Sequence, residues 1–246
     1  MDTTTPTRVA LVTGGSGGIG RVVSKRLAED GMAVAVHYAG NEARADEVVE
    51  EITSSGGRAM KVAGDVADEE AMAEAFDAVE QGFGGVDVVV HTAGQMILGL
   101  LADFDLDKLD RMHRTNIRGT FVVDRLAAKR VREGGAIVNF SSSVVKLALP
   151  TYAPYAATKG AVDAISLILA RELRGRDITV NAVAPGPTAT PLFLDGKDEE
   201  TIDNMSRMAP LERLGTPEDV AEAVAFLAGP ARWVNGQVIY ANGGII

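Results

Sequence analysis

Short runs of apolar residues alternate along this chain with longer, amphipathic segments. The short runs have the length of buried strands, and they begin at Val9, Met32, Val86, Gly135, Asp177 and Gln237. One more strand is expected just ahead of Asp65. In the longer segments apolar residues recur every three or four positions, which predicts helices over residues 19–29, 43–52, 69–83, 106–131, 155–173 and 217–227.

Strands that alternate with helices favour a parallel sheet, because each crossover helix returns the chain to the same edge of the sheet. The pattern therefore predicts an α/β fold with a doubly wound parallel sheet of about seven strands and helices on both faces. We expect one domain over residues 1–246. Within it, the polar, proline-interrupted stretch 188–212 is typical of a lid over a substrate.

Composition excludes several classes of partner. With 246 residues and 46% hydrophobic content, the chain is long enough for one large core. A formal net charge of −10 disfavours nucleic acid and anionic membranes as partners. No cysteine and only three histidines are present, so we expect no metal site. Because the N-terminal MDTTTPTRV lacks a leader pattern and no apolar run is long enough to span a bilayer, we expect a cytoplasmic protein.

A glycine-rich loop, TGGSGGIG, joins the first predicted strand to the first helix. Glycines in such a loop permit a tight turn and a close backbone approach, and the helix N-terminus offers free N–H groups to a pyrophosphate. The simpler interpretation is a tight strand-to-helix turn, but the position favours a Rossmann-type dinucleotide site. The residues expected against the cofactor are Gly14, Ser16, Gly17, Gly18, Ile19 and Gly20.

The end of the second strand bears on the choice of cofactor. An NAD site often has a carboxylate there, whereas this chain has His37 and Tyr38. The missing acid favours NADP(H). NAD(H) remains the alternative, because the nearest bases, Arg21 and Arg44, do not directly follow the strand. Further cofactor contacts are expected after the third and fourth strands, from Asp65, Val66, Ala93 and Gly94.

Tyr155 and Lys159 are four residues apart in a predicted helix, so both side chains lie on one face. A nearby ammonium favours the ionised form of a phenol, which predicts a lowered pKa for Tyr155 and proton exchange near neutrality. Carbonyl reduction needs such an acid beside a nicotinamide, which supplies hydride. The serine run 141–143 offers a hydroxyl to the substrate oxygen. Each motif alone also fits an ordinary helix or turn.

Together these motifs resemble the short-chain dehydrogenase/reductases, in the family's order and across nearly the whole chain: TGGSGGIG, the GDV at Gly64, the AG at Ala93, Asn116, the serine run, YAATK, the PG at Pro185 and the terminal NGG. The chain is most similar to bacterial 3-oxoacyl-acyl carrier protein reductases and related carbonyl reductases. Two departures from the family pattern bear on cofactor or substrate contacts. The asparagine-rich strand end usual before AG is replaced by the HTAG of His91 to Gly94, and the glycine often found three residues after the catalytic serine region is replaced near Lys146.

The resemblance assigns a role to each residue of a catalytic tetrad. It implies that Tyr155 is the acid/base, that Lys159 lowers the pKa of Tyr155 and holds the ribose, and that Ser142 polarises the substrate oxygen, with Ser143 second. Asn116 then lies in a helix distortion that helps to hold a water. The resemblance also implies a homotetramer or dimer through helices 106–131 and 155–173, and cofactor contacts from Pro185, Gly186, Thr188 and Thr190.

We therefore expect an NADP(H)-dependent reductase of a ketone or 3-oxoacyl group, acting on a small carbonyl compound or an acyl thioester. The alternatives are an NAD-dependent dehydrogenase of a secondary alcohol, steroid or sugar, and a dinucleotide-binding regulator without turnover. Lys146 and Arg207 are weak candidates for binding an anionic group on the substrate. The expected substrate wall consists of Gln95, Val144, Lys146, Leu147, Tyr152, Pro187 and the residues from Leu192 onward.

Overall fold

The computed structural model describes residues 7–246, so the first six residues of the expected leader-free N-terminus lie outside the described part. Its centre is a parallel sheet of seven strands in the order β3-β2-β1-β4-β5-β6-β7. This topology confirms the predicted doubly wound α/β fold. The strands are β1 (Val9–Thr13), β2 (Ala33–Tyr38), β3 (Arg58–Ala63), β4 (Val86–His91), β5 (Val131–Phe140), β6 (Thr179–Pro185) and β7 (Val238–Ala241).

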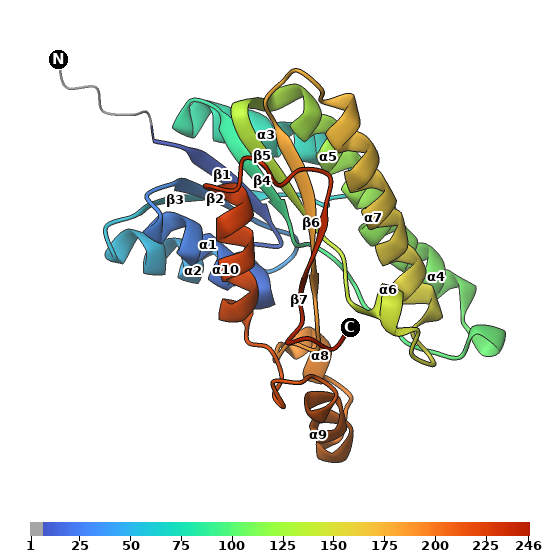
Figure 1. Cartoon of the computed structure of the whole chain (residues 1–246). Helices are drawn as coiled ribbons and strands as arrows, with labels where there is room; N and C mark the ends of the chain where they lie inside the picture. The colour runs from blue at the N-terminus through green and yellow to red at the C-terminus, as the bar shows by residue number, and fades with distance from the viewer. Residues whose placement is uncertain (1–6) are drawn as a thin grey trace.

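Helices cover both faces of the sheet (Figure 1). Helices α1, α2 and α10 pack on one face, and α3, α5 and α7 pack on the other. The chain also forms a short 3-10 turn at Leu101–Asp103. The helices are α1 (Gly18–Glu29), α2 (Glu42–Ser54), α3 (Glu69–Phe83), α4 (Leu106–His113), α5 (Gly119–Arg130), α6 (Val144–Leu147), α7 (Ala153–Glu172), α8 (Pro191–Leu194), α9 (Glu199–Arg207) and α10 (Pro217–Ala228).

Two apolar cores flank the sheet, because successive strand residues point to opposite faces. In β1, Leu11 belongs to the core under α3, α5 and α7, whereas Ala10 and Val12 belong to the core under α1, α2 and α10. Both faces are therefore buried. This double burial is the physical reason why the central strands read as continuous apolar runs in the sequence.

The predicted helix 106–131 is not one regular α-helix. It divides into α4 and α5, which are joined by a π-helical turn at Arg114–Arg118, and its last residue, Val131, already belongs to β5. The residues that flank the turn, His113 and Gly119, both have right-handed helical backbone angles, so the chain stays helical on either side of it. Thr120 donates from its hydroxyl to the carbonyl of Asn116 at 2.7 Å within this segment.

The order of the strands reverses between β1 and β4, and such a switch point opens a crevice at the carboxyl ends of the strands. The glycine-rich loop, the serine run and the start of α7 all lie at that edge, below the sheet in Figure 1, where α6 and α8 also lie. No helix within residues 7–246 combines the length and the apolar character needed to cross a membrane.

Candidate active site

A cavity of about 760 Å³ occupies the switch-point edge of the sheet. Most of the residues expected at the site line it. Tyr38 and Asn116 are not among the lining residues. The lining residues that were expected are Gly14, Ser16, Gly17, Gly18, Ile19, Gly20, His37, Asp65, Val66, Ala93, Gly94, Ser142, Tyr155, Lys159, Pro185, Gly186, Thr188 and Thr190.

The glycine-rich loop is shaped by close packing at one point and open space at another. Gly14 has φ +66°, a left-handed conformation that favours glycine, and a Cβ on Gly20 would lie 2.3 Å from the Gly14 carbonyl oxygen. A Cβ on Gly17, by contrast, would have no atom within 4 Å. Gly17 caps the N-terminus of α1, so free N–H groups and open space coincide. This arrangement fits a pyrophosphate.

The end of β2 brings one expected residue to the cavity and leaves one outside. His37 accepts from the Gly14 N–H through Nδ1 at 3.3 Å, and burial lowers the pKa of His37 to about 4, so the ring is neutral at pH 7. Tyr38 points to the opposite face of the strand, where its phenol contacts Glu42. Tyr38, which was expected beside the cofactor, therefore does not line this cavity.

The two candidate bases near the end of β2 differ in their surroundings. Arg21 is held by two carboxylates of α2, Glu47 at 3.2 Å and Glu51. Arg44, at the start of α2, lines the cavity, and none of the ion pairs within residues 7–246 engages it. The cavity end beside β2 therefore carries a basic group with unused donors.

Asp65 has both roles considered for it. Its carboxylate accepts from the Ala67 N–H at 2.9 Å, as a turn aspartate does, and it also lines the cavity. Partial burial acts to raise the pKa of Asp65, but the Ala67 N–H and the paired Arg114 guanidinium outweigh this effect and hold the pKa below its ordinary value. The group is thus a fixed negative charge near the end of β3.

Tyr155, Lys159 and Ser142 meet on the floor of the cavity. Lys159 donates to the Phe140 carbonyl at 2.7 Å, and its Nζ lies 5.7 Å from the centroid of the Tyr155 ring. The Ser142 hydroxyl contacts the Tyr155 phenol. Together these groups form a hydroxyl pair with a buried ammonium behind it, which is the arrangement that proton transfer to a substrate oxygen requires.

The pKa of Tyr155 is not lowered, contrary to what the sequence had led us to expect. Burial raises the pKa of Tyr155 above its ordinary value, while the Ser142 hydroxyl acts in the opposite direction. Burial also lowers the pKa of Lys159 to about 8, opposed by Asp163. The expectation failed because it counted the ammonium and left out desolvation, which disfavours both charged forms. At pH 7 Tyr155 is a neutral phenol, ready to donate.

Ser142 and Ser143, in the serine run after β5, have different partners. Ser143 is buried and donates to the Ala184 carbonyl at 3.2 Å, while its oxygen accepts from Asn242 Nδ2 at 3.2 Å. Its hydroxyl is therefore committed to holding β6 and the C-terminal segment. Ser142 accepts only a long bond from the Val144 N–H, at 3.4 Å, and faces Tyr155. Of these two, Ser142 is free to meet a substrate oxygen.

Asn116 acts behind the cavity wall. Its amide oxygen accepts from the Gln95 N–H at 2.8 Å, and its Nδ2 donates to the Gln95 carbonyl at 2.8 Å and to Thr158 at 3.0 Å. The side chain therefore ties the loop after β4 to α7. The π-helical turn is what places this amide, which agrees with the helix distortion implied by the resemblance.

The segment after β6 closes the other side of the cavity. Thr188 donates to the Gly186 carbonyl at 2.9 Å, and Thr190 caps α8 by accepting from the Phe193 N–H at 3.3 Å. A Cβ on Gly18 would lie 3.8 Å from Thr190, so this segment reaches the glycine-rich loop. A Cβ on Gly186 would lie 2.9 Å from Cα of Asn242, which explains why the PG and NGG motifs occur together.

The substrate wall is more apolar than the sequence indicated. Lys146 lies over the Tyr240 ring at 4.5 Å and Arg207 pairs with Asp203, and neither lines the cavity. The weak hypothesis that they hold an anion therefore finds no support in their positions. Phe193 and Met205 line the cavity from the segment expected after Leu192, whereas Met96, Arg111 and Leu149 carry no motif and were not expected from the sequence.

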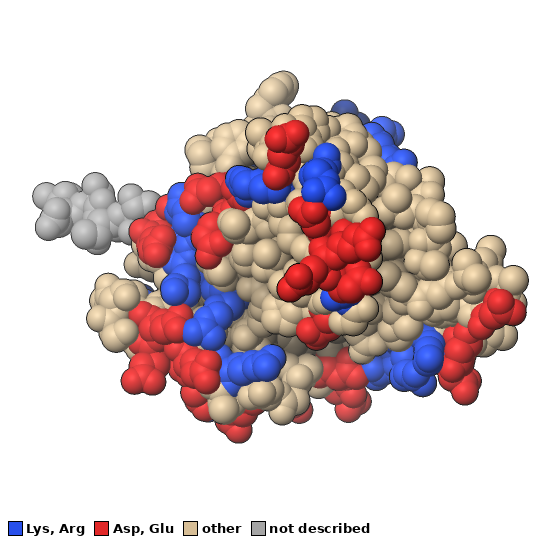
Figure 2. Space-filling view, turned by 90° about the horizontal axis from the view of Figure 1, so that it is seen from below, with Lys and Arg blue, Asp and Glu red and all other residues tan. Residues whose placement is uncertain are grey.

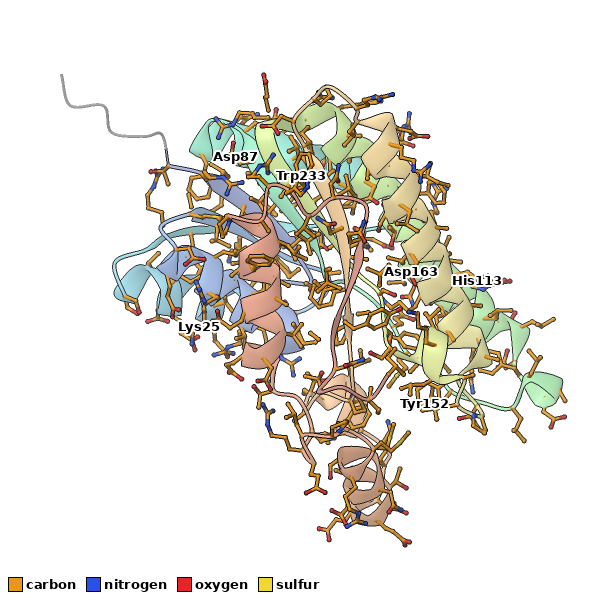
Figure 3. All side chains as sticks on the ribbon, in the orientation of Figure 1. Lys25, Asp87, His113, Tyr152, Asp163 and Trp233 are labelled. Atoms are coloured by element: carbon orange, nitrogen blue, oxygen red, sulfur yellow. The ribbon has the colours of Figure 1, made fainter. Side chains whose placement is uncertain are left out.

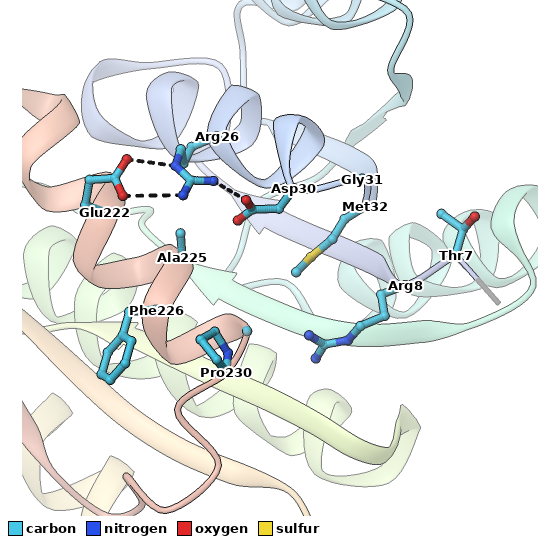
Figure 4. Close-up of a pocket in the computed structure, with 11 residues that line it drawn as sticks. Thr7, Arg8, Arg26, Asp30, Gly31, Met32, Glu222, Ala225, Phe226 and Pro230 are labelled. Carbon is cyan, nitrogen blue, oxygen red and sulfur yellow. Dashed lines mark hydrogen bonds and ion pairs between the residues drawn. The ribbon is translucent and has the colours of Figure 1, made fainter. Parts of the chain in front are cut away.

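A second cavity, of about 710 Å³, lies at the opposite edge of the sheet (Figure 4). Arg26 crosses it and bonds to both Glu222 and Asp30, whereas the Arg8 guanidinium, which also lines the cavity, donates to the Ala228 carbonyl at 2.6 Å. It contains no member of the expected tetrad. Residues 7–246 also hold no cluster of three or more His, Asp or Glu side chains able to bind a metal ion.

Known proteins resemble this chain along nearly its whole length. The family model described as enoyl-(acyl carrier protein) reductase matches residues 14–246. A short-chain type dehydrogenase/reductase of Picea abies is 44% identical over 248 residues, which cover 96% of this chain and 92% of the relative. A 3-oxoacyl-acyl-carrier-protein reductase of Staphylococcus aureus is 40% identical over 242 residues, with coverage of 97% and 98%.

A solved structure has the same fold over almost the whole length of the chain. The short-chain dehydrogenase of Burkholderia cenocepacia in complex with NADP superimposes with a TM-score of 0.91 at 39% identity, and 98% of each chain is covered. Sequence and structural similarity thus extend over the glycine-rich loop, the serine run and α7 together. By these matches and by its own cavity, the chain belongs to the short-chain dehydrogenase/reductase family.

Proposed function

We propose that this protein is an NADP(H)-dependent reductase that converts a ketone or a 3-oxoacyl group reversibly into a secondary alcohol. The observation that carries the proposal is the floor of the cavity, where the Tyr155 phenol contacts the Ser142 hydroxyl in front of the buried Lys159 ammonium. The cavity runs from this floor to the open, N–H-rich start of α1, which fits a dinucleotide.

Each residue of the floor has a defined task in reduction. When bound, the nicotinamide supplies hydride to the carbonyl carbon. The Ser142 hydroxyl donates to the carbonyl oxygen and polarises it, and Tyr155 gives its proton to the same oxygen as charge develops there. Lys159 then stabilises the phenolate that remains. Because Tyr155 is protonated at pH 7, reduction starts from the protonation state that is already dominant.

The preference for NADP(H) rests on the cavity end beside β2. No carboxylate of β2 meets the ribose there, His37 is neutral, and the Arg44 guanidinium lines the cavity with unused donors. A guanidinium suits a 2'-phosphate because it can donate two parallel hydrogen bonds. The structural relative in complex with NADP supports the same choice.

The proposal is tested by following absorbance at about 340 nm while a panel of ketones, including a 3-oxoacyl thioester, is mixed with NADPH or NADH. We expect NADPH to be consumed by wild type and by Tyr240→Phe, whose phenol lies outside the cavity. Tyr155→Phe should lower the rate by about 10²–10⁴. Equal rates in Tyr155→Phe and wild type would refute the mechanism. Tight NADPH binding without turnover of any ketone would favour a dinucleotide-binding regulator.

We further propose that residues 188–212 act as a lid, that the protein is cytoplasmic and that it assembles as a homotetramer. Leu192, Phe193 and Met205 reach the cavity from α8 and α9, which supports the lid. Phe121 on α5 and Ile168 on α7 are 59% and 56% exposed, so both helices have apolar surface available, which supports association through them. Light scattering of wild type and Ile168→Lys tests the assembly, and an unchanged mass would exclude that interface.

A further inference from the structure

Helix α7 carries a second ionisable side chain directly behind the catalytic lysine. Asp163 lies four residues after Lys159, so both side chains project from the same face of the helix. The residue is partly buried and lies on α7 in Figure 3. Its Oδ1 is shielded from solvent and has no hydrogen-bond partner. A shielded carboxylate oxygen of this kind requires a compensating charge nearby.

The neighbours of Asp163 supply that charge. Burial raises the pKa of Asp163, while Lys159 on its own helix and Lys146 on α6 act in the opposite direction and favour the carboxylate. The Ser141 hydroxyl, which is also shielded, lies beside it at the end of β5. Ser141 directly follows Phe140, whose carbonyl accepts from Lys159. Asp163, Ser141 and Lys159 therefore form one cluster behind the cavity floor.

The groups that face Lys159 are mostly uncharged. From β5 it meets the Phe140 carbonyl, and from α7 the neutral Tyr155 phenol. From β4 it faces His91, which is neutral because burial, with the Lys159 charge acting in the same direction, lowers the pKa of His91 to about 3. Asp163, one helical turn further along α7, supplies a negative charge that acts to raise the pKa of this lysine.

We propose that Asp163 is a positioning residue whose carboxylate keeps the Lys159 ammonium charged inside the buried site. Lys159 in turn stabilises the Tyr155 phenolate that forms during reduction, so Asp163 acts on the reaction through Lys159. The effect of Asp163 on the charge of Lys159 follows from the cluster alone. Only its effect on ketone reduction rests on the proposed function.

The proposal predicts what happens when the carboxylate is removed. Burial already lowers the pKa of Lys159 to about 8, and Asp163 opposes that effect. Loss of a nearby opposite charge lowers the pKa of an ammonium by about one unit. In Asp163→Asn, Lys159 would then lose its proton close to neutral pH. A variant that keeps the charge, Asp163→Glu, should stay near the wild-type value.

Nuclear magnetic resonance of protein labelled at lysine ¹³Cε measures this pKa without any turnover. The Lys159 signal is identified by its absence in Lys159→Arg and followed from about pH 6 to pH 10, the range around the pKa of a buried lysine. The matched control is Glu172→Gln, an exposed carboxylate at the end of the same helix. We expect a downward shift of about one unit in Asp163→Asn and in Asp163→Ser, and none in the control. An unshifted Lys159 in both charge-removing variants overturns the inference.

The pH profile of kcat/KM for ketone reduction gives the second readout. We expect the basic limb to move to lower pH by the same amount as the lysine signal in Asp163→Asn, and to return in Asp163→Glu. A purely structural role would lower the rate at every pH and leave the limb in place, which would contradict the inference. A shifted lysine signal in a protein that reduces no ketone would refute the proposed function and leave the electrostatic role of Asp163 standing.

Discussion

At the scale of single residues, desolvation decides the resting state of the site. Tyr155 and Lys159 are both buried, and burial disfavours the phenolate as well as the ammonium. The phenol keeps its proton across the neutral range, whereas the ammonium keeps its charge only below about pH 8. Reduction therefore has its two groups in the correct state together below that pH, and the lysine is the group that sets the basic limit.

The two serines Ser142 and Ser143 should respond differently to removal of the hydroxyl. Ser142→Ala should lower kcat by about 10²-fold, because a donor to the developing oxyanion is lost. Ser143→Ala should instead lower the free energy of unfolding by about 1 kcal/mol, since it removes the acceptor of Asn242 Nδ2 and a donor to the Ala184 carbonyl. Steady-state kinetics and thermal unfolding of both variants check this. A large loss of kcat in Ser143→Ala, with kcat unchanged in Ser142→Ala, would instead make Ser143 the catalytic hydroxyl.

Cofactor preference should depend on Arg44 and not on Arg21. Arg44→Ala should raise KM for NADPH about tenfold or more, because charge-assisted hydrogen bonds of roughly 1.5–3 kcal/mol are lost, while KM for NADH stays nearly constant. Arg21→Ala is the control, since that guanidinium is occupied by Glu47 and Glu51. A loss of NADPH preference in Arg21→Ala alone would move the 2'-phosphate site to the other base.

The site residues that could be predicted from the sequence are those marked by a local sequence pattern. The four-residue spacing of Tyr155 and Lys159 fixes a shared helix face, and the glycine-rich loop fixes its own position after β1. Tyr38 was expected beside the cofactor, but it does not line the cavity although its neighbour His37 does, because successive strand residues face opposite sides of the sheet. The occupation of Arg21 depends on carboxylates of another helix, which no local pattern reveals.

At the scale of elements, the glycine-rich loop after β1 contains one glycine that is closely packed and one that has open space around it. Gly20→Ala places a methyl group 2.3 Å from the Gly14 carbonyl oxygen and 2.6 Å from Thr92 Oγ1, so the loop or α1 must move. We expect a loss of about 1–3 kcal/mol in the free energy of unfolding. Gly17→Ala has open space around it and should leave stability unchanged, but its methyl group would occupy room needed by the pyrophosphate.

Denaturant unfolding and NADPH titration separate these two effects. Gly20→Ala should unfold at lower denaturant, whereas Gly17→Ala should unfold like wild type and bind NADPH about tenfold more weakly or worse. Unchanged affinity in Gly17→Ala would mean that the dinucleotide does not lie against the start of α1.

Two elements were hard to predict for physical reasons. Strand β3 lies at the edge of the sheet and is only partly buried, so it shows no continuous apolar run, and only Asp65 after it indicated its presence. The π-helical turn at Arg114–Arg118 is flanked on both sides by residues with right-handed helical backbone angles, so the sequence shows no break in the helix there. Asn116 attracts attention in the sequence, but its bonds to Gln95 and Thr158 come from elements far away along the chain.

At the scale of the whole molecule, a carboxyl group lies in the core between α5 and β5. Asp124 accepts from Asn139 Nδ2 at 2.8 Å, and Asn139 Nδ2 also contacts Ser166 of α7 at 3.0 Å. Burial raises the pKa of Asp124 to about 7, although the Asn139 bond acts in the opposite direction. Because the folded pKa exceeds the unfolded one, folding stability is highest at acidic pH in this respect and is lost as pH rises from about 4 to about 7.

Replacement of this carboxyl group should therefore stabilise the protein more at alkaline pH. Asp124→Asn keeps an acceptor for Asn139 and cannot ionise, so its melting temperature should exceed that of wild type by several degrees more at about pH 8 than at about pH 5. The exposed Asp107→Asn is the control. A gain that is equal at both pH values would show that Asp124 does not titrate in this window.

The two ends of the cavity come from different halves of the polypeptide. The loop after β1 and Arg44 belong to the first quarter of the chain, whereas Ser142, Tyr155 and the segment after β6 follow much later. A change of coenzyme can therefore arise by substitution in one stretch without disturbing proton transfer, and a new substrate can be admitted by altering the other. Chimaeras joined near β4 should inherit coenzyme choice from one parent and substrate choice from the other, which makes this architecture a natural unit for recombination.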